Sequence, residues 1–552
     1  MTTKIQSKEQ ISGVNYWVCV IGIIIFMACL ESREINRPLD GLHSWAQATG
    51  AWATRVHIKY GLSYTKGLTT WAVGDPPKAN PKKYLDHPQL SILLAWLFCS
   101  IVGVSEFTLR LLAISVSIVT MALFMLMLKK LMEPVTALLA GLLYAVFPLT
   151  GYFYTGSWTT LFGFSAIYCY LVIIKAFANA PEPKKYHKIG LAAGIFLCLQ
   201  VNWVGFFYAM AIGVHYVFRC IKRKEYPSFV LLAIMVFSPA ISMIITFSIM
   251  LAGYGGDISK IFELYKWRAG KGEMQQMQSF DWSLWFGKLW EFSLTNYTLP
   301  VVMIAILYIT IGQFFVFSKD PDPLTGRRSR QFPQFWLFFM VPFFALFILR
   351  GCLWRHQTWL VPLTPCVAIA ASLGICMVWD YLKKISFKIA LVAVLAILSI
   401  CTSYCIAGTN YYYAIRWQPE AKIKMFQMLN SRIPPDKYLL SFDPFIVNQN
   451  ESKGAFYRPE IAWYLDREII QATRLEEVTE AAKTGKYPFY LMPLSLGDPQ
   501  TDAYLNNLSK QLGQLYKYEY IPGVSGEMDG RGRFLKAGMS NYLLFDLQKP
   551  VK

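Results

Sequence analysis

Charged residues are scarce in this sequence, and that scarcity restricts its fold class. Asp, Glu, Lys and Arg make up 16% of the 552 residues, whereas they make up about a quarter of an ordinary soluble domain. Hydrophobic residues reach 55% and gather into long runs, as helices that cross a bilayer require. The composition argues against a soluble enzyme and predicts a polytopic α-helical membrane protein.

The short motifs of several catalytic classes are also absent. There is no zinc-type spacing of cysteine and histidine, no glycine-rich phosphate loop after a strand, and no Ser/His/Asp nucleophile signature. The 11 cysteines lie in or beside apolar segments, which is not the pattern of a disulfide framework. Lys and Arg outnumber Asp and Glu by 53 to 34. They lie mostly in short connectors, where membrane orientation explains them better than a nucleic-acid partner does.

Eleven apolar runs are candidate membrane spans. Positive charge concentrates in connectors between them, and the positive-inside rule places those connectors in the cytoplasm. The N-terminus is then predicted inside and the C-terminus outside. The spans are approximately 15–30, 108–128, 135–152, 158–177, 189–204, 205–218, 228–251, 299–317, 335–349, 360–381 and 389–406, and the basic connectors are 129–130, 184–188, 219–224, 327–330 and 383–384.

A twelfth apolar stretch, 89–104, follows Pro88 and has only 16 residues. This is short for a hydrocarbon layer of about 30 Å, and counting it as a crossing would invert every later connector. We therefore expect a helix that lies in the outer interface or dips into it.

Three segments are predicted to lie outside: 31–107, 252–298 and the tail 408–552. The expected organisation is a transmembrane domain, 1–407, which carries the first two as outer loops, and a small extracytoplasmic α/β domain, 408–552. The tail contains no cysteine, so a hydrophobic core alone must stabilise it. Its pattern predicts helices at 419–430, 459–466, 475–484 and 501–512, and strands at 438–441, 489–492 and 543–545.

Polar side chains suited to chemistry gather in the first outer loop. Transporters place charged residues near the bilayer midplane, but these candidate spans contain almost none. A polar cluster beside the membrane suits a substrate with a lipid tail and an anionic head.

The order of several segments resembles the GT-C glycosyltransferases. After the first span come Arg37-Pro-Leu-Asp40-Gly-Leu-His43-Ser-Trp45, then Tyr84-Leu-Asp86-His87-Pro88, and much later Arg355-His356-Gln-Thr-Trp359-Leu-Val-Pro362. The layout is most similar to the branch of the protein O-mannosyltransferases and the lipid A aminoarabinose transferase, which is glycosyltransferase family 39-like. The similarity covers roughly residues 10 to 410.

The resemblance implies a GT-C fold of about 11 transmembrane helices with juxtamembrane helices. It also implies that a sugar passes from a polyprenyl-phosphate donor to an envelope lipid, glycan or protein acceptor at the outer face. In its closest branch the reaction is an inverting displacement that needs no metal or other cofactor. Such a displacement requires a carboxylate that takes the acceptor's proton and positive charge that holds the leaving lipid phosphate.

Asp40 and Asp86 are the candidate catalytic bases. Asp40 follows the first span, but it also suits the N-cap of a helix starting near Gly41. Asp86 precedes His87 and Pro88, where plain turn chemistry is the alternative.

Six basic residues are candidates for binding the donor phosphate or substrate. A histidine donates to phosphate oxygen, and an arginine fork donates two parallel bonds. The alternatives are a hydrogen-bonded scaffold for the histidines and an interfacial anchor for the arginines. The six are His43, Arg55, Lys83, His87, Arg355 and His356.

One departure from the resemblance concerns the second carboxylate that many relatives carry where the third and fourth spans meet. Here the turn reads Tyr154-Thr-Gly-Ser157-Trp158 and contains no acid. A two-carboxylate mechanism and a metal bridged between the two acids are therefore in doubt, although the sequence does not exclude a divalent metal.

The second outer loop joins a glycine-rich segment, 253–257, to a tryptophan-rich stretch with Trp267, Trp282, Trp285 and Trp290. Glycines permit movement and aromatic rings stack on sugars, so a mobile lid over the donor is one interpretation. An aromatic belt at the headgroups explains the tryptophans equally well.

Two other functions fit the same features: a ligase or polymerase of lipid-linked glycans, and a transporter or flippase of polyprenyl-linked saccharides. The predicted location is a bacterial inner membrane, with the N-terminus in the cytoplasm and the C-terminal domain in the periplasm. Membrane lipids are expected partners and nucleic acids are not. The sequence does not identify the sugar, the acceptor or the oligomeric state.

Overall fold

The computed structural model describes residues 13–41, 44–79, 81–85, 87–148, 154–177, 182–253, 255–269, 280–312, 334–355, 357–414, 420–443, 447–448, 456–457, 459–522 and 541–551. The chain forms two compact units. The helical unit comprises Met1–Ile35, Leu85–Ser91 and Arg110–Tyr411, and the mixed unit comprises Asn36–Tyr84, Ile92–Leu109 and Tyr412–Lys552. This division differs from the predicted boundary after residue 407, because most of the first outer loop groups with the C-terminal tail. The predicted domains 1–407 and 408–552 stay a prediction.

Each of the eleven predicted spans coincides with a helix. Within the described ranges, five helices are long and apolar enough to cross a membrane, or six if the bent pair of α11 and α12 is one span. The chain is a polytopic helical membrane protein, and the count of eleven crossings stays a prediction. The helices are α1 (Gly13–Ser32), α4 (Glu106–Leu131), α5 (Pro134–Val146), α6 (Tyr154–Ile173), α7 (Lys185–Val201), α8 (Gly205–Arg223), α9 (Phe229–Gly253), α10 (Ser259–Arg268), α11 (Trp282–Tyr297), α12 (Leu299–Leu307), α14 (Phe335–Ile348), α15 (Arg350–Arg355), α16 (Thr364–Ile385) and α17 (Phe387–Ala414). A π-helical turn, Tyr308–Gly312, follows α12, and a 3-10 segment, Gln357–Leu363, precedes α16.

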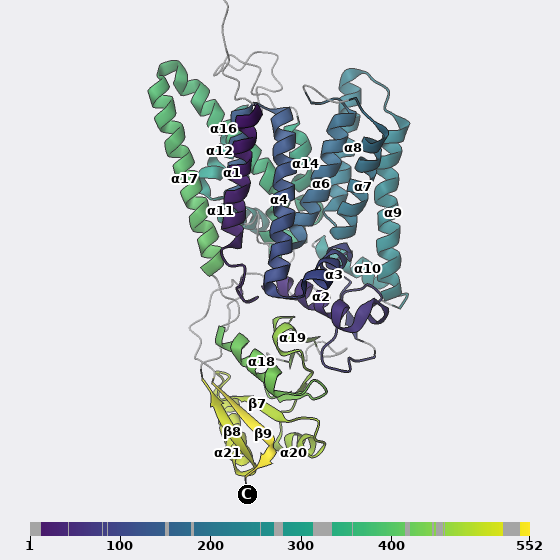
Figure 1. Cartoon of the computed structure of the whole chain (residues 1–552), viewed down its shortest axis with the longest axis vertical. Coiled ribbons are helices and arrows are strands. Elements are labelled where there is room, and N and C mark those ends of the chain that lie inside the picture. The colour runs from purple at the N-terminus through teal and green to yellow at the C-terminus, as the bar shows by residue number, and fades with distance from the viewer. Residues whose placement is uncertain are drawn as a thin grey trace, which may run out of the picture. The chain divides into compact units, whose positions relative to one another are not determined.

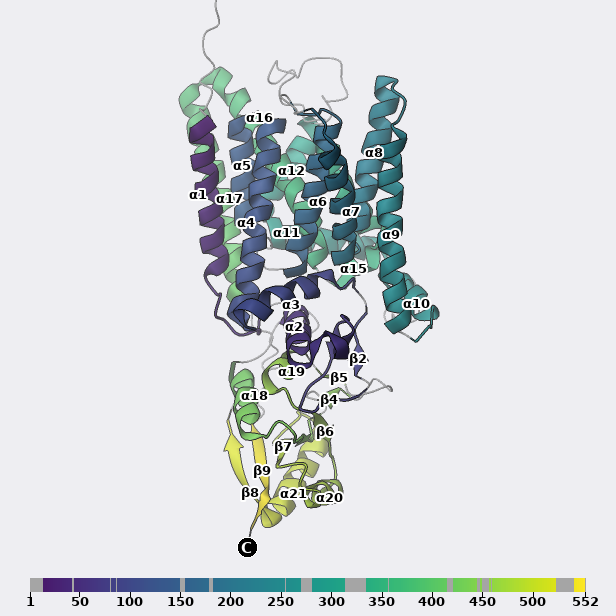
Figure 2. The same cartoon turned by 45° about the vertical axis from the view of Figure 1, so that its right-hand side comes forward.

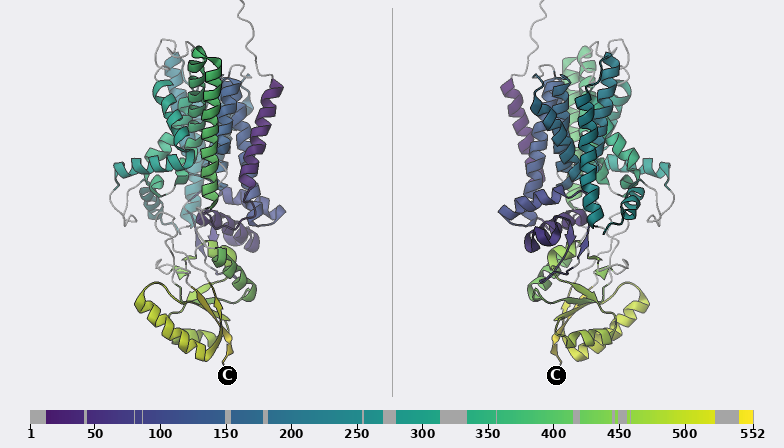
Figure 3. Two further views of the ribbon diagram at one scale, coloured as in Figure 1. Left: turned by 90° about the vertical axis from the view of Figure 1, so that its left-hand side faces the viewer. Right: turned by 90° about the vertical axis from the view of Figure 1, so that its right-hand side faces the viewer.

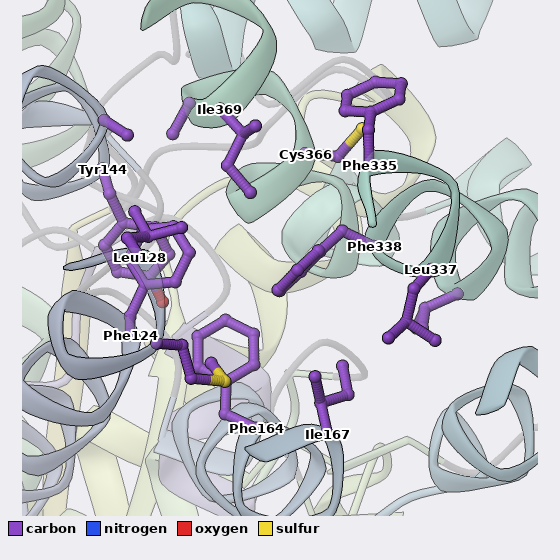
Figure 4. Close-up of a cluster of buried hydrophobic side chains, with 14 of the residues drawn as sticks. Phe124, Leu128, Tyr144, Phe164, Ile167, Phe335, Leu337, Phe338, Cys366 and Ile369 are labelled. Atoms are coloured by element: carbon purple, nitrogen blue, oxygen red, sulfur yellow. The ribbon is translucent and has the colours of Figure 1, made fainter. Parts of the chain in front are cut away.

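The core of the helical unit is built from aromatic and aliphatic side chains of α4, α5, α6, α14 and α16 (Figure 4). Phe124 and Phe164 stack with their ring centroids 5.3 Å apart, and Phe338 meets Phe164 edge-on at 6.2 Å. Aromatic pairs in these geometries add to the free energy gained from burial. This core fixes the bundle that carries the connecting segments.

Within the helical unit, the connectors that follow α4, α8 and α16 lie at one end of the bundle, and α10 lies at the other end (Figure 2). These three connectors contain Lys129-Lys130, Arg219 to Lys224 and Lys383-Lys384. The concentration of lysine and arginine at a single end is the arrangement from which the positive-inside rule assigns orientation.

The mixed unit contains a five-stranded sheet in the order β6-β3-β7-β9-β8. Strand β3 (Leu439–Ser441) pairs in parallel with β6 (Ile469–Gln471) and β7 (Phe489–Pro493), while β9 (Tyr542–Pro550) runs antiparallel to β7 and to β8 (Tyr516–Ile521). Figure 1 shows α20 and α21 beside these strands. The other elements are α2 (Ser44–Thr65), β1 (Thr70–Trp71), β2 (Lys82–Lys83), α3 (Leu90–Val102), α18 (Glu420–Arg432), β4 (Val447–Asn448), β5 (Phe456–Tyr457), α19 (Pro459–Leu465), α20 (Leu475–Lys483) and α21 (Pro499–Leu515).

The helices and strands expected in the tail are present as α18 to α21, β3, β7 and β9, whereas β4, β5, β6 and β8 were not predicted. Leu505, Leu508 and Leu512 of α21 are buried with Tyr490 and Phe545 of the sheet. Their i, i+3, i+7 spacing places the three leucines on one face of the helix. A core of this kind stabilises the sheet without a disulfide.

The stretch 89–104 contains α3, a helix of 13 residues. At a rise of 1.5 Å per residue such a helix is about 20 Å long, less than the hydrocarbon thickness of a bilayer. Its expected place in the outer interface stays a prediction.

Helix α19 joins the first outer loop to the tail inside the mixed unit. It packs on α2, and the backbone N–H of Gly74 donates to the carbonyl of Asp466 at 3.2 Å, directly after the helix. Trp463 of α19 donates its indole N–H to Glu106 at 2.9 Å. Residues about 400 positions apart in the chain therefore form a single packed body.

Candidate functional site

Asp40 lies buried in the mixed unit and is paired with Arg37. Nε of Arg37 donates to Oδ1 of Asp40 at 2.6 Å, and the two side chains are 7% and 2% exposed. The expected alternative was an N-cap for a helix near Gly41, but α2 begins at Ser44. The buried ion pair, rather than helix capping, is therefore the observed environment of Asp40.

The tail holds the backbone of this acidic segment, residues 37–40. The N–H of Leu39 donates to Oη of Tyr464 at 2.6 Å, and Arg37 donates to the carbonyl of Tyr413. Both partners belong to the tail, so the position of Asp40 depends on residues from the other end of the chain.

Arg55 binds protein groups within the mixed unit. Its two terminal nitrogens donate to the carbonyls of Ala462, at 2.6 Å, and Trp463, at 2.5 Å, and its guanidinium carbon lies 4.8 Å from the centroid of the Trp463 ring. Burial lowers the pKa of Arg55, while the charge of Asp466, 3.6 Å away, acts in the opposite direction. Arg55 thus caps the C-terminus of α19, where a cation stabilises the last carbonyls. This structural role does not support the predicted binding of a lipid phosphate.

Lys83 lies on β2, where its backbone pairs with Thr70 of β1. Beside it, the rings of Trp52, Trp71 and Tyr84 form a ladder with centroid separations of 5.8 and 5.4 Å and nearly parallel planes. Trp52 is fully buried and donates to the carbonyl of Ala72 at 2.8 Å. The ladder fixes the hairpin that carries Lys83, whose role in substrate binding stays a prediction.

His57 on α2 is a buried titratable group that sequence reasoning did not single out. It is 1% exposed, and its Nδ1 lies 2.8 Å from Oγ1 of Thr65. Burial lowers the pKa of His57 to about 4, so the imidazole is neutral near pH 7. It is a stabilising hydrogen-bonded side chain rather than a cation for a phosphate.

A second group of polar residues, the basic cluster, lies in the helical unit and consists of His87, Arg268 and Arg350. Nη2 of Arg268 lies 3.4 Å from Nε2 of His87, and because arginine has only donors, the histidine nitrogen accepts. Arg268 is 5% exposed at the end of α10. Arg350 opens α15 and donates through Nε to the carbonyl of Ala269 at 3.3 Å.

The geometry of the basic cluster suits an anion. Arg350 donates to the carbonyl of the residue that follows Arg268, and a phosphate that accepts from both guanidinium groups would form charge-assisted bonds. The contact with His87 places one predicted residue in this cluster. Gly253 packs nearby, since a Cβ built on it would lie 2.3 Å from Cδ1 of Leu85, two residues before His87.

The remaining predicted residues are only partly accessible to description. His43, Asp86 and His356 lie outside the described residues, and Arg355 is described only by its backbone position at the end of α15. Among the described ranges, no three His, Cys, Asp or Glu side chains come together as metal ligands.

Three contributing residues escaped sequence reasoning: Arg37, Arg268 and Arg350. Arg37 carries one signal, because an i, i+3 Arg and Asp pair before a helix is a common local ion pair. Arg268 and Arg350 are single arginines beside apolar runs and are separated by 82 positions, as Arg350 minus Arg268 gives. No local pattern brings them together.

Part of the chain matches a known family. Residues 86–243 match the model of the dolichyl-phosphate-mannose-protein mannosyltransferase family, a stretch that is less than half of the chain. No curated protein sequence matches the chain significantly.

Two solved structures share the fold over nearly the whole chain. ArnT from Cupriavidus metallidurans, bound to undecaprenyl phosphate, superimposes with a TM-score of 0.55 at 10% identity and covers 97% of this chain and 98% of its own. AglB, an archaeal oligosaccharyltransferase from Archaeoglobus fulgidus in complex with an inhibitory peptide and a dolichol-phosphate, gives 0.52 at 11% identity, covering 95% and 74%. The resemblance to GT-C glycosyltransferases that the sequence indicated is confirmed, and at these identities the structures establish the fold.

Proposed function

Starting from this fold, we propose that the chain is an integral membrane glycosyltransferase that moves a sugar from a polyprenyl-phosphate donor to a cell-envelope lipid, glycan or protein at the outer face. The observation that carries the proposal is the basic cluster, in which Arg268 meets His87 and Arg350 donates to the carbonyl next to Arg268. Two proteins of the same fold were solved with polyprenyl-type phosphates, undecaprenyl phosphate in one and a dolichol-phosphate in the other.

Asp40 is the proposed catalytic base. Its carboxylate takes the proton of an acceptor hydroxyl as that oxygen bonds to the anomeric carbon and the bond from that carbon to the phosphate oxygen breaks. Arg37 orients the carboxylate through the bond at 2.6 Å. Attack opposite to the leaving phosphate inverts the anomeric centre. Asp86 remains the second candidate.

The basic cluster is the proposed holder of the leaving group. The phosphate gains charge as the glycosidic bond breaks, and fixed donors stabilise that charge most in the transition state. Nε2 of His87 accepts a hydrogen bond from Arg268, so His87 acts here by orienting that guanidinium. Asp40 and the basic cluster belong to different units, and each role is proposed by itself.

The finer assignments follow the same proposal. The chain crosses a bacterial inner membrane eleven times, with its N-terminus in the cytoplasm. The tail 408–552 lies in the periplasm, where it binds the acceptor or stabilises the first outer loop. The reaction proceeds without a metal.

Mass spectrometry of envelope lipids and glycans, with and without the gene, identifies the sugar that is lost. We expect Asp40→Asn to abolish its transfer when variant and wild type are compared at equal amounts of folded protein, because the substitution also leaves Arg37 unpaired. Asp498→Asn, at an exposed position that caps α21, should leave transfer intact. Full transfer by both variants would remove Asp40 from the mechanism.

Binding of undecaprenyl phosphate tests the other half of the proposal. Arg268→Met should weaken it at least about tenfold, because a charge-assisted bond contributes about 1.5 to 3 kcal/mol. Arg432→Met, in an exposed pair of the tail, is the control. Two results together would favour a flippase over a transferase. Loss of the gene would remove no sugar from the envelope lipids and glycans, and only substitutions of polar groups inside the spans would alter the cells that carry the gene.

A further inference from the structure

Helix α11 carries an exposed aromatic stripe that the proposed reaction does not use. Trp282, Phe286 and Trp290 are 43%, 52% and 46% exposed and lie at i, i+4 and i+8, which is one side of a helix. Trp285 is fully buried and anchors the helix to the protein. The opposite side of α11 carries the ion pair of Lys288 and Glu291, 2.7 Å apart, together with Leu284, which is 49% exposed.

The direction of α11 is set by its junction with α12. The two helices meet at an angle of 110°, at Thr298, whose φ is +67°. Helix α12 packs against α16 within the bundle and is a predicted span, so α11 runs roughly across the direction of the spans. Figure 3 shows α11, in teal, projecting sideways from the bundle.

A run of aromatic rings connects this stripe to the surface of a predicted span. On α14, Phe343 and Phe347 are 40% and 37% exposed, and their ring centroids lie 4.8 Å apart. The Phe347 ring lies 6.2 Å from that of Trp282, and the Trp282 ring 6.1 Å from that of Phe286. The side chains that a span presents to hydrocarbon are therefore continuous with those of α11.

These features match a helix seated at the bilayer interface. An in-plane helix with one apolar side and one polar side partitions there, and tryptophan is enriched at headgroup level. A soluble partner does not explain the continuity with α14, because the exposed rings of a predicted span are expected to face lipid.

The stripe also holds Arg350. The guanidinium carbon of Arg350 lies 5.1 Å from the centroid of Trp282 and 4.3 Å from that of Phe280. Its carbonyl accepts from the indole N–H of Trp285 at 3.1 Å. Through Nε, the same arginine reaches the carbonyl of Ala269, next to Arg268.

We propose that α11 is an in-plane anchor whose stripe, Trp282, Phe286 and Trp290, inserts into lipid at the bilayer interface and thereby positions Arg350 in the basic cluster. The insertion is independent of the proposed sugar transfer. The consequence for a lipid phosphate rests on that proposed function.

The insertion is tested by photo-crosslinking the full chain in nanodiscs of phosphatidylethanolamine and phosphatidylglycerol. The photoreactive residue p-benzoylphenylalanine replaces Phe286, with Glu291 on the polar side as the matched negative position and the exposed Ile244 of α9 as the lipid reference. We expect lipid adducts by mass spectrometry at 286 and 244 and none at 291. A 286 adduct to a second copy of the chain, or a 286 yield no higher than that at 291, overturns the insertion.

The positioning of Arg350 is tested with two matched variants, Trp282→Leu and Trp290→Leu. Both keep the stripe apolar, but only the first removes the ring beside Arg350. Hydrogen exchange of residues 350–355 should become about threefold faster in Trp282→Leu, the effect of losing one partly exposed cation–π contact, and should stay at the wild-type rate in Trp290→Leu. Equal exchange in both variants overturns the positioning.

Binding of undecaprenyl phosphate separates this inference from the proposed function. A wild-type chain that does not bind it refutes the role of the basic cluster, yet leaves the crosslinking and exchange results to decide on the anchor. If the wild type binds, Trp282→Leu should weaken binding about threefold and Trp290→Leu should not. Equal binding by the two variants removes Arg350 positioning from donor recognition.

Discussion

The pair of Arg37 and Asp40 is expected to be strongly coupled in stability. The side chains are 7% and 2% exposed and are joined at 2.6 Å, so removing one charge leaves the other buried and unpaired. Such a loss costs about 3 to 5 kcal/mol, whereas replacing both charges by apolar side chains is often close to neutral. We therefore expect Arg37→Met and Asp40→Leu each to lower the melting temperature of the detergent-solubilised protein sharply. The double variant should melt above either single variant.

The double variant also loses a second hydrogen bond of Arg37. Arg37 also donates to the carbonyl of Tyr413, and losing this bond from a charged donor costs about 1.5 to 3 kcal/mol, so the double variant should still melt below the wild type. The exposed pair of Arg432 and Glu519, 41% and 45% exposed, is the matched control, and removing it should change melting little. The reasoning fails if the two shifts at Arg37 and Asp40 simply add.

Three further outcomes are expected. Because burial lowers the pKa of His57 from 6.5 to about 4, the unfolded chain binds a proton below pH 6.5 that the folded chain does not. The contribution of neutral His57 to stability is therefore complete above pH 6.5 and falls as the pH approaches 4, by about 3 kcal/mol at most. The melting temperature should drop less between pH 7.5 and 4.5 in His57→Gln than in the wild type. An equal drop in the two proteins contradicts the prediction. Gly253→Ala should lower the free energy of unfolding by about 1 to 3 kcal/mol, since its Cβ would lie 2.3 Å from Cδ1 of Leu85. If this contact is the cause, adding Gly253→Ala to a Leu85→Ala variant should lower the melting temperature less than it does in the wild type. Arg55→Lys should lower melting by losing one of two carbonyl bonds while binding of undecaprenyl phosphate stays at the wild-type level, and weaker binding without lower melting would restore the phosphate role.

The helices of this protein could be located from sequence because their signals are local. A span needs consecutive apolar residues, and the stretch 335–349, for example, coincides with α14 to within a residue. In the tail, the spacing of Leu505, Leu508 and Leu512 predicted α21 for a comparable reason. Strand β6 has only three residues, Ile469–Gln471, and no alternation, whereas β8, Tyr516–Ile521, alternates tyrosine with Lys517 and Glu519, a signal that was overlooked. They are strands because their neighbours in the sheet pair with them.

The candidate site was less accessible to sequence reasoning. Asp40 and His87 were selected from their chemistry and position, but the partners that decide their roles, Arg37 and Arg268, were not. For Arg55, predicted to bind a phosphate, the sequence did not reveal the observed partners, the carbonyls of a helix more than 400 residues away in the chain. Charge and residue type are readable from sequence, whereas the identity of a partner is a property of packing.

The tail illustrates the same difference at a larger scale. Truncation before residue 408 is one way to ask whether the tail, 408–552, is accessory. It would, however, remove Tyr413 and Tyr464, which hold the segment of Asp40. Loss of transfer in such a truncation would report on the acidic segment as much as on any function of the tail.

The sequence by itself determined that the chain is a helical membrane protein, where its helices lie, and which segments carry polar chemistry, because hydropathy and periodicity are written in neighbouring residues. Only the tertiary structure decided that Asp40 is held by Arg37 and by the tail, and that Arg268 meets His87 while Arg350 reaches the carbonyl of Ala269. These contacts join residues far apart in the chain, and their free energy depends on burial and geometry that no local pattern encodes.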